Sequence, residues 1–177
     1  MERKITTLKP FFEEPNRDFH IRELSRILKI NHTSVRQHLN KLTKEGFLKV
    51  IDGKVYKSYK PDINKKFLNL KLYYNLEKLR ISGFVKDIER SFDYPVIVLF
   101  GSYASAYDDK NSDVDICLIT GIKKEFKTEK YEKILNRRIS LHFFSDKEWE
   151  KAKTKNSPLI NNICNGIVLS GQLEVIK

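Results

Sequence analysis

Two short motifs in the second half of the chain carry side chains that could handle a nucleotide. An apolar run at 96–100 ends in Gly101-Ser102, and after ten residues come Asp113 and Asp115, one residue apart. Side chains alternate along a strand, so these carboxylates would share one face and repel each other unless a cation lies between them. Mg²⁺ accepts such oxygens when phosphate oxygens complete its shell. Gly101 would let the backbone approach a phosphate, and the Ser102 hydroxyl would bind its oxygens.

Strands and helices of a small α/β domain must position these motifs. Residues 96–100 form a continuous apolar run typical of a central strand, and 112–119 predict the strand that carries the acidic pair. A third strand is expected at 138–144. A capping box at 145–148 and a last helix within 157–166 complete the scaffold. We therefore predict a mixed sheet with helices, and the alternative is a generic α/β domain with an acidic turn.

The first third of the chain has the pattern of a winged helix. The expected elements are helices at 2–12 and 21–28, a third helix between the N-cap residue Asn31 and Gly46, and a hairpin of 47–51 and 54–59 around Asp52-Gly53. The second and third helices are joined by three residues, as in a helix-turn-helix. Asp-Gly between β-rich runs is the strongest short signal for a hairpin.

The outer face of the third helix carries groups that hydrogen-bond to base edges and phosphates. This predicted DNA-contact face consists of Thr33, Ser34, Arg36, Gln37, Asn40 and Lys41, and the hairpin adds Lys54 and Lys57. Residues 1–60 hold 14 Lys and Arg against 7 Asp and Glu, which favours a polyanionic partner. The alternatives are a winged helix that binds protein and a lysine-rich surface that only maintains solubility.

The motifs at 99–104 (Leu-Phe-Gly-Ser-Tyr-Ala) and 112–116 (Ser-Asp-Val-Asp-Ile) resemble the nucleotidyltransferases of the polymerase-beta superfamily, especially the minimal ones. The interval of ten residues is similar to that of transferase antitoxins that attach AMP to a partner protein. The whole chain looks like archaeal proteins in which a winged helix precedes such a domain. The resemblance implies that Ser102 binds the terminal phosphates of a nucleoside triphosphate, while the catalytic residues Asp113 and Asp115 hold Mg²⁺ or Mn²⁺. An acceptor hydroxyl would then take up the nucleotide and release pyrophosphate.

The chain departs from the pattern of the resembled family at two places. Family members usually carry a small basic-Gly step after Gly-Ser-x-Ala, where this chain has Ser105 and Ala106. They also take a third metal-binding carboxylate from a later strand, but 138–144 holds no Asp or Glu and offers Ser140 and His142. A hydroxyl and an imidazole are poor substitutes for a carboxylate at Mg²⁺, which implies slow catalysis. His142 is interpreted either as a base or as a structural residue.

Length and composition limit the remaining classes of protein. The chain has 177 residues, and 40% of them are hydrophobic. This is enough apolar side chain to form one or two hydrophobic cores, so a disordered chain is excluded. No apolar run approaches the roughly 20 residues of a membrane span, and the first residues lack a signal-peptide pattern. Cys117 and Cys164 lie in apolar stretches and predict reduced core residues. We therefore expect a cytoplasmic protein with no membrane partner.

The combined prediction is an α+β chain with an N-terminal winged helix-turn-helix DNA-binding domain at 1–62, a helical connector at 63–92 and a nucleotidyltransferase-like domain at 93–177. The leading hypothesis is a metal-dependent nucleotidyltransferase that acts on a hydroxyl of a protein or nucleic acid and is targeted by binding double-stranded DNA. The rival hypothesis is a DNA-binding transcriptional regulator whose transferase-like domain binds nucleotide but reacts slowly or not at all. A toxin-like protein partner and a homodimer formed through the connector also stay open.

Overall fold

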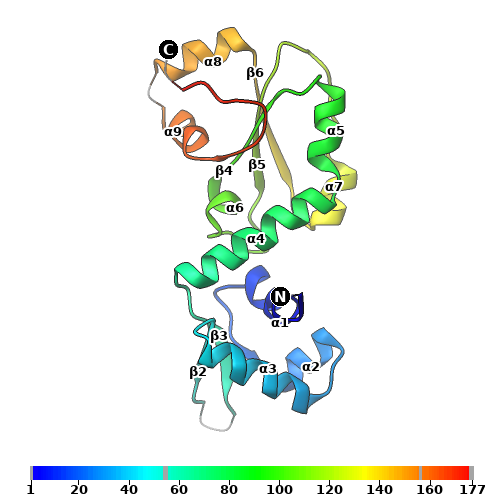
Figure 1. The fold of residues 1–177 in the computed structure, drawn as a ribbon, viewed down its shortest axis with the longest axis vertical. Helices are drawn as coiled ribbons and strands as arrows, with labels where there is room; N and C mark the ends of the chain where they lie inside the picture. The colour runs from blue at the N-terminus through cyan, green and yellow to red at the C-terminus, as the bar shows by residue number, and fades with distance from the viewer. Residues whose placement is uncertain (1, 54–55, 156, 176–177) are drawn as a thin grey trace. The chain divides into compact units, whose positions relative to one another are not determined.

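The computed structural model describes residues 2–53, 56–155 and 157–175, and the chain divides into two compact units, Met1–Tyr74 and Asn75–Lys177 (Figure 1). Helix α4 (Lys65–Ile81) runs through the boundary between them. Its Phe67 lies in the core of the first unit, and its Leu79 lies in the core of the second. The structure therefore divides the segment at 63–92, which the sequence analysis set apart as a connector, between two cores.

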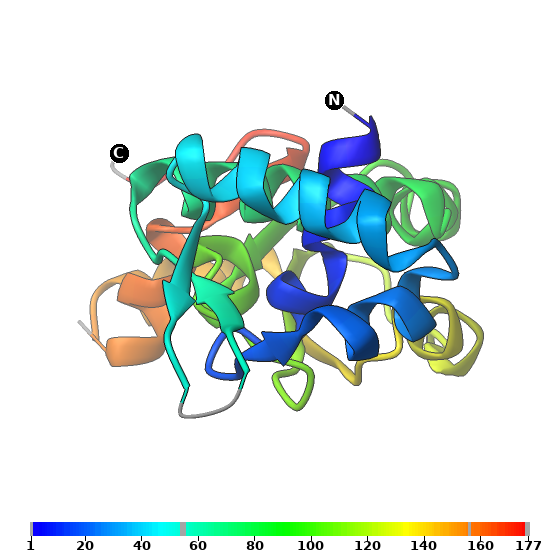
Figure 2. The ribbon, with the colours of Figure 1, turned by 90° about the horizontal axis from the view of Figure 1, so that it is seen from below.

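The first unit is a winged helix (Figure 2). Its elements before α4 are α1 (Glu2–Glu13), β1 (Phe19–His20), α2 (Ile21–Leu28), α3 (His32–Lys44), β2 (Leu48–Ile51) and β3 (Ser58–Pro61). The strands form an antiparallel sheet in the order β1-β3-β2. The predicted caps of α3 are confirmed, because the Asn31 side chain accepts a hydrogen bond of 2.8 Å from the Ser34 N–H and Gly46 follows the helix with a φ of 75°.

Buried side chains from all three helices form the core of this unit. Leu8 and Phe12 of α1 pack with Leu24 of α2 and with Val35 and Leu39 of α3. Burying one such side chain contributes roughly 1.5–3 kcal/mol, so the apolar stripe of α3 decides which face of the helix turns inward. The polar residues of the predicted DNA-contact face are left on the opposite, solvent-facing side.

The hairpin of the winged helix differs from the predicted two-residue turn. Ile51 pairs with Ser58, so the connection between β2 and β3 spans residues 52–57. This register places Tyr59 opposite Phe19 of β1, and both side chains are buried. Strand register follows what the side chains bury, and this register pairs the buried Tyr59 with Val50, which packs against the same core. The prediction of a tight turn was wrong for this reason.

The second unit is a mixed four-stranded sheet with helices, as the sequence predicted. The strands lie in the order β6-β5-β4-β7, and β5 pairs parallel with β6 and antiparallel with β4. The strands are β4 (Val96–Phe100), β5 (Val114–Ile119), β6 (Ile139–Phe144) and β7 (Ile167–Ser170). The helices after α4 are α5 (Phe84–Ser91), α6 (Gly101–Ser105), α7 (Glu129–Leu135), α8 (Asp146–Lys153) and α9 (Pro158–Cys164).

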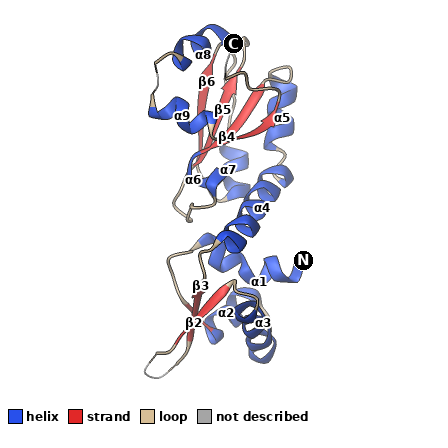
Figure 3. Cartoon of the chain, turned by 60° about the vertical axis from the view of Figure 1, so that its left-hand side comes forward, coloured by secondary structure: helices blue, strands red, loops and turns tan. Residues whose placement is uncertain are grey.

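Each face of this sheet has its own apolar core. Leu99 and Ile116 point to the face covered by α5 and α7, whereas Val98 and Cys117 point to the face covered by α8 and α9. Figures 1 and 3 show these two pairs of helices on opposite sides of the central strands. Asp115 lies two residues before Cys117 and therefore shares its side of the sheet. The acidic pair accordingly belongs to the α8–α9 side.

Strand β7 was not predicted from the sequence. It pairs antiparallel with β4, with Ile167 opposite Leu99, and closes one side of the sheet. Gly166 precedes it so close to β4 that a Cβ there would lie 2.5 Å from the Leu99 carbonyl oxygen. Val168 of this strand is exposed, so β7 lacks the continuous apolar pattern that marked β4. Its pairing with a distant strand, rather than its own composition, makes it a strand.

The two cysteines behave as the sequence predicted. Both are free thiols, and burial raises the pKa of Cys117 to about 12, so that this thiol stays protonated. Within the described part of the chain, no helix combines the length and the hydropathy that a membrane crossing requires.

Candidate functional site

The acidic pair lies where β4 ends and β5 begins. Asp115 is in β5 opposite Phe100, the last residue of β4, and Asp113 immediately precedes β5. Gly101 follows β4 with a φ of 75°, and a Cβ at this position would collide with Oδ2 of Asp115. Glycine suits this position because it adopts a positive φ without strain and because a larger residue would push the Asp115 carboxylate away. The structure thus brings Gly101 and Asp115 into direct proximity.

The two carboxylates influence each other. Both side chains are partly buried. Burial raises the pKa of Asp115 above its ordinary value, the charge of His142 opposes this rise, and the negative charge of Asp113 adds to it. A pair of partly buried carboxylates that repel each other is stabilised by a cation.

The residues around this pair fit one divalent cation that arrives with a phosphate ligand. Asp113 and Asp115 supply the hard oxygens that Mg²⁺ or Mn²⁺ prefers. Within the described ranges, no group of three or more His, Cys, Asp or Glu side chains is placed to hold a metal. A divalent cation at this pair would therefore have two protein carboxylates, and phosphate oxygens would have to complete its coordination shell.

Strand β6 places a hydroxyl and an imidazole beside the pair. Its parallel register sets Ser140 next to Asp115 and His142 next to Cys117. The Ser140 Oγ and the His142 Nε2 lie within hydrogen-bond distance, 3.1 Å apart, and the His142 ring packs at 5.3 Å from the ring of Phe100. Ser140 thus lies beside Asp115 on the neighbouring strand, at one of the two positions that the sequence analysis set against a third carboxylate.

The Gly-Ser turn leads directly into the short helix α6. Ser102 is partly exposed, and the Ser105 hydroxyl donates hydrogen bonds to the carbonyls of Gly101 and Ser102 at 3.1 and 3.2 Å. Ala106 ends this helix with a φ of 60°, in the left-handed region. An L-residue there costs roughly 1–2 kcal/mol, whereas glycine adopts the region freely. Ala106 therefore holds a left-handed backbone conformation that glycine would adopt more readily.

A buried polar network holds the loop that carries Asp113. Asp108 and Arg137 form an ion pair of 3.8 Å, and their side chains are only 1% and 2% exposed. Asn75 of α4 donates hydrogen bonds to Asp108 Oδ1 at 2.9 Å and to the Tyr103 carbonyl at 3.0 Å. The network ties α4, α6 and the start of β6 to the loop that precedes Asp113. It therefore sets the position of that carboxylate from outside the metal pair.

Most of the predicted DNA-contact face is exposed on α3 of the first unit. The exposed members are Thr33, Arg36, Gln37, Asn40 and Lys41. Ser34 is partly buried and donates its N–H to the Asn31 side chain. Lys57 is exposed on the hairpin, where it lies 3.3 Å from the Asp52 carboxylate, and Lys54 lies outside the described residues.

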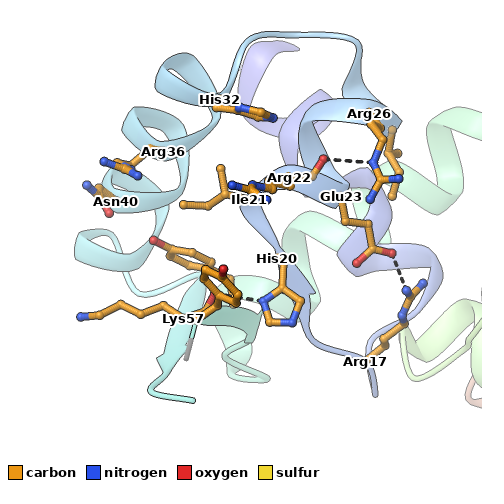
Figure 4. Close-up of a pocket in the computed structure, with 13 residues that line it drawn as sticks. Arg17, His20, Ile21, Arg22, Glu23, Arg26, His32, Arg36, Asn40 and Lys57 are labelled. Atoms are coloured by element: carbon orange, nitrogen blue, oxygen red, sulfur yellow. Dashed lines mark hydrogen bonds and ion pairs between the residues drawn. The ribbon is translucent and has the colours of Figure 1, made fainter. Parts of the chain in front are cut away.

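A basic hollow of about 1,100 Å³ lies between α2, α3 and the hairpin (Figure 4). Figure 4 shows Arg36 and Asn40 on α3 and Lys57 extending from the hairpin on the same side. The sequence analysis missed Arg22 and Arg26 of α2, which also line this hollow. Their spacing of four residues on the polar side of a short helix was a signal that could have found them. Cations from α2 thus extend the predicted DNA-contact face.

The fold and the two sites define a nucleotidyltransferase-type sheet joined to a winged helix. Comparison with known families agrees: residues 80–162 match the nucleotidyltransferase domain, and residues 16–50 match the bacterial regulatory proteins of the arsR family. The chain therefore combines a helix-turn-helix DNA-binding domain with a nucleotidyltransferase domain. A search of curated proteins found no match to this chain.

Proposed function

We propose that the protein is a metal-dependent nucleotidyltransferase that moves a nucleoside monophosphate from a triphosphate to a hydroxyl of a macromolecule. Its winged helix brings this activity to double-stranded DNA. The observation that carries the proposal is the close approach of Gly101 to the Asp115 carboxylate, with Asp113 beside it. A phosphate bound by the backbone next to Gly101 would lie beside the acidic pair, and the paired carboxylates would supply the charge that holds its metal.

In this proposal Ser102 and the backbone at Gly101 bind phosphate oxygens, and Asp113 and Asp115 hold Mg²⁺ or Mn²⁺ against them. When bound, the metal would neutralise charge that develops on the transferring phosphoryl group. The acceptor oxygen forms a bond to the α-phosphorus, and the bond from that phosphorus to the β-phosphate oxygen breaks. Pyrophosphate leaves with the electron pair, and the hydroxyl proton passes to solvent.

Transfer of a labelled nucleotide tests this function. The full chain is incubated with cell extract, Mg²⁺ or Mn²⁺, and triphosphates labelled either at the α- or at the γ-phosphate. We expect covalent attachment of the α-label and none of the γ-label, because pyrophosphate leaves. Absence of nucleotide binding by the folded protein would contradict the proposal. Nucleotide binding without transfer would instead favour a DNA-binding regulator.

A carboxylate added beside the acidic pair should accelerate the reaction. Without a third carboxylate, we expect turnover below the usual range of roughly 1–10³ per second. Ser140→Asp places a carboxylate next to Asp115 on the neighbouring strand, and we expect it to raise metal-dependent affinity roughly tenfold or more, since changes around a metal typically alter its affinity about 10–100-fold. His142→Asp, beside Cys117 on the same face of β6, is the comparison that tests whether the next position also supplies the missing carboxylate. Both variants are compared by label transfer, and an equal gain in both would refute this assignment of position.

Changes on the predicted DNA-contact face should weaken binding to duplex DNA. The double variant Arg36→Ala with Gln37→Ala should lose about 1–3 kcal/mol of binding free energy per base contact removed. Lys57→Ala should mainly lower the slope of log affinity against log salt, by about 1, because a phosphate contact is lost. Fluorescence anisotropy at several salt concentrations measures both effects, with the exposed Lys151→Ala of α8 as the charge-matched control. A full chain without salt-sensitive duplex affinity would show that the winged helix binds another partner.

A further inference from the structure

Ser140 and His142 of β6 form a hydroxyl–imidazole pair on the face of the sheet that carries Asp115. Side chains alternate along a strand, and β6 pairs parallel with β5, so both residues share this face. The Ser140 Oγ and the His142 Nε2 are 3.1 Å apart. In the tautomer that carries its proton on Nδ1, the imidazole accepts a hydrogen bond from the hydroxyl. A serine hydroxyl that donates to an imidazole nitrogen has the arrangement of an activated nucleophile.

The three central strands set the position of this pair. Phe100 of β4, Asp115 of β5 and Ser140 of β6 lie in one row across the sheet. The ring of His142 packs against the ring of Phe100, with 5.3 Å between the centroids and 63° between the planes. Phe100 is only 4% exposed, so this contact restrains the imidazole. The imidazole therefore needs no ligand to orient it.

The Ser140 hydroxyl lies where it can meet a phosphate bound at the acidic pair. Neighbouring strands are about 4.7–4.9 Å apart, and side chains of one row on one face stand side by side. Asp115 and Ser140 are such neighbours, and both are only partly buried. A phosphate that shares a metal ion with Asp115 would therefore lie next to the Ser140 Oγ.

Other hydroxyls near the acidic pair are committed to different partners. Ser105 donates to two backbone carbonyls of the Gly-Ser turn, at 3.1 and 3.2 Å. Ser112 donates to the Asp109 carboxylate at 3.4 Å and accepts a hydrogen bond of 3.0 Å from the Asp109 N–H. Within residues 2–53, 56–155 and 157–175, neither of these hydroxyls is hydrogen-bonded to an imidazole. Ser140 differs from both because its partner can take up a proton.

We propose that Ser140 is itself an acceptor of the transfer reaction, so that the protein attaches one nucleoside monophosphate to its own chain. The inference rests on the proposed function. The Ser140 Oγ forms a bond to the α-phosphorus of the triphosphate as the bond from that phosphorus to the β-phosphate oxygen breaks. Pyrophosphate leaves with the electron pair, and the hydroxyl proton passes to the His142 Nε2 and from there to solvent. The phosphodiester on Ser140 then fills the place beside Asp115 and stops a second turnover.

A built-in acceptor suits a site with two metal-binding carboxylates. An acceptor that diffuses in has to be positioned at every turnover, whereas Ser140 is fixed on the strand next to Asp115. Well-oriented intramolecular groups react as if they were present at about 10⁵ M or more. A single self-transfer therefore tolerates a weakly held metal better than repeated transfer to a free acceptor does.

Mass spectrometry of the labelled protein tests self-attachment. The full chain, purified and without cell extract, is incubated with Mg²⁺ or Mn²⁺ and with triphosphates labelled at the α- or the γ-phosphate. We expect the α-label alone, at no more than one per chain and on the peptide that contains Ser140. Ser140→Ala should abolish this label, whereas Ser140→Thr keeps a hydroxyl and should retain it. Ser140→Asp should lose it too, while its transfer to other molecules rises as predicted above.

Ser91→Ala is the matched control for this experiment. Ser91 is the last residue of α5, which covers the opposite face of the sheet, and its side chain is also partly buried. The substitution removes the same hydroxyl without touching the acidic pair. The variant should therefore take up the α-label like the unaltered chain.

An electrophilic probe gives a readout that needs neither nucleotide nor metal. An alkyl fluorophosphonate carries a reactive phosphorus, so an activated serine bonds to it and releases fluoride, and the proton again passes to His142. We expect the probe on Ser140 of the folded chain. His142→Asn should slow this labelling by about 100-fold or more, the usual contribution of a general base. If the variant is folded, as the fluorescence of the buried Trp149 reports, and is labelled at the unaltered rate, His142 does not activate Ser140 and the inference is contradicted.

Mixing two chains distinguishes transfer within one chain from transfer between chains. A tagged copy with Asp113→Asn and Asp115→Asn is mixed with the unaltered chain and α-labelled triphosphate. Because Ser140 is partly buried beside its own Asp115, we expect label on the unaltered chain alone, at a rate that does not depend on protein concentration. Label on the tagged copy would contradict the inference.

Three further results would overturn the inference. Label on another hydroxyl near the acidic pair, at Ser102, Ser105 or Ser112, would assign the acceptor there. Label that persists unchanged in Ser140→Ala would exclude Ser140. Label on other molecules of a cell extract, with none on the chain itself, would show an external acceptor. In each of these cases the α-label is transferred and the proposed function stands, whereas a folded chain that binds no triphosphate with Mg²⁺ would contradict both.

Discussion

Replacing Asp113 and Asp115 with Asn should abolish the Mg²⁺-dependent binding of a nucleoside triphosphate to the folded protein. Asn preserves the shape of each side chain but removes both negative charges from the pair. The loss of a group that only orients a metal ligand typically costs 10–100-fold in metal affinity, so the loss of both ligands should cost more than about 100-fold. Titration calorimetry with a non-hydrolysable triphosphate, with and without Mg²⁺, measures the change.

Asp93→Asn is the matched control for this experiment. Asp93 is exposed in the same unit, and its φ of 53° is a conformation that Asn tolerates. Its replacement with Asn removes one carboxylate charge from the surface and leaves the acidic pair intact. It should therefore leave the Mg²⁺-dependent affinity for the triphosphate unchanged. A double Asn variant that binds Mg²⁺ and nucleotide within threefold of the unaltered chain would show that the pair does not hold the metal.

Arg137→Ala should destabilise the second unit by about 3–5 kcal/mol. The substitution leaves the Asp108 carboxylate, which is 1% exposed, buried without its guanidinium partner. Removing one partner of a buried ion pair typically costs this much, because an uncompensated charge stays in the interior. Trp149 is the single Trp of the chain and is buried in the second unit, so its fluorescence during urea unfolding reports on this unit.

The neighbouring residue offers the comparison for this prediction. Arg138 is exposed, and its replacement with Ala removes the same charge from the surface. Surface substitutions usually change the free energy of unfolding by less than about 0.5 kcal/mol. If Arg137→Ala and Arg138→Ala shift the urea midpoint equally, the buried pair does not stabilise the unit.

The parts of the protein that could be predicted from sequence are those in which neighbouring residues determine the structure. Asn31 and Gly46 bound α3 through local backbone chemistry, and the apolar run of β4 needs no partner to be recognised. Gly101 and the acidic pair were found in the same way. From the sequence, Gly101 was predicted to let the backbone approach a phosphate. The structure adds that Gly101 lies directly against the Asp115 side chain.

The parts that could not be predicted depend on contacts between distant segments. Strand β7 forms only because it pairs with β4, and the length of the hairpin loop follows from the pairing of Tyr59 with Val50. A hollow beside Asp113 also combines residues from two loops, with Lys110 on one and Arg138 on the other. Neither residue stands out in a lysine-rich chain until Arg137 draws the two loops together.

The course of α4 limits how this gene could have been assembled from older ones. A recombination breakpoint at residue 93, just ahead of β4, would leave behind Asn75, Leu79, Phe84 and Ile88, which belong to the polar network and the apolar core of the transferase. A transferase module that keeps both the polar network and the whole core therefore begins inside α4, at or before Asn75, and not in a loop. An exchange of the winged helix between related genes would then have to join two coding sequences within α4, so that the helix continues across the junction. Ancestral fusions of this kind should show their sequence discontinuity near residue 74.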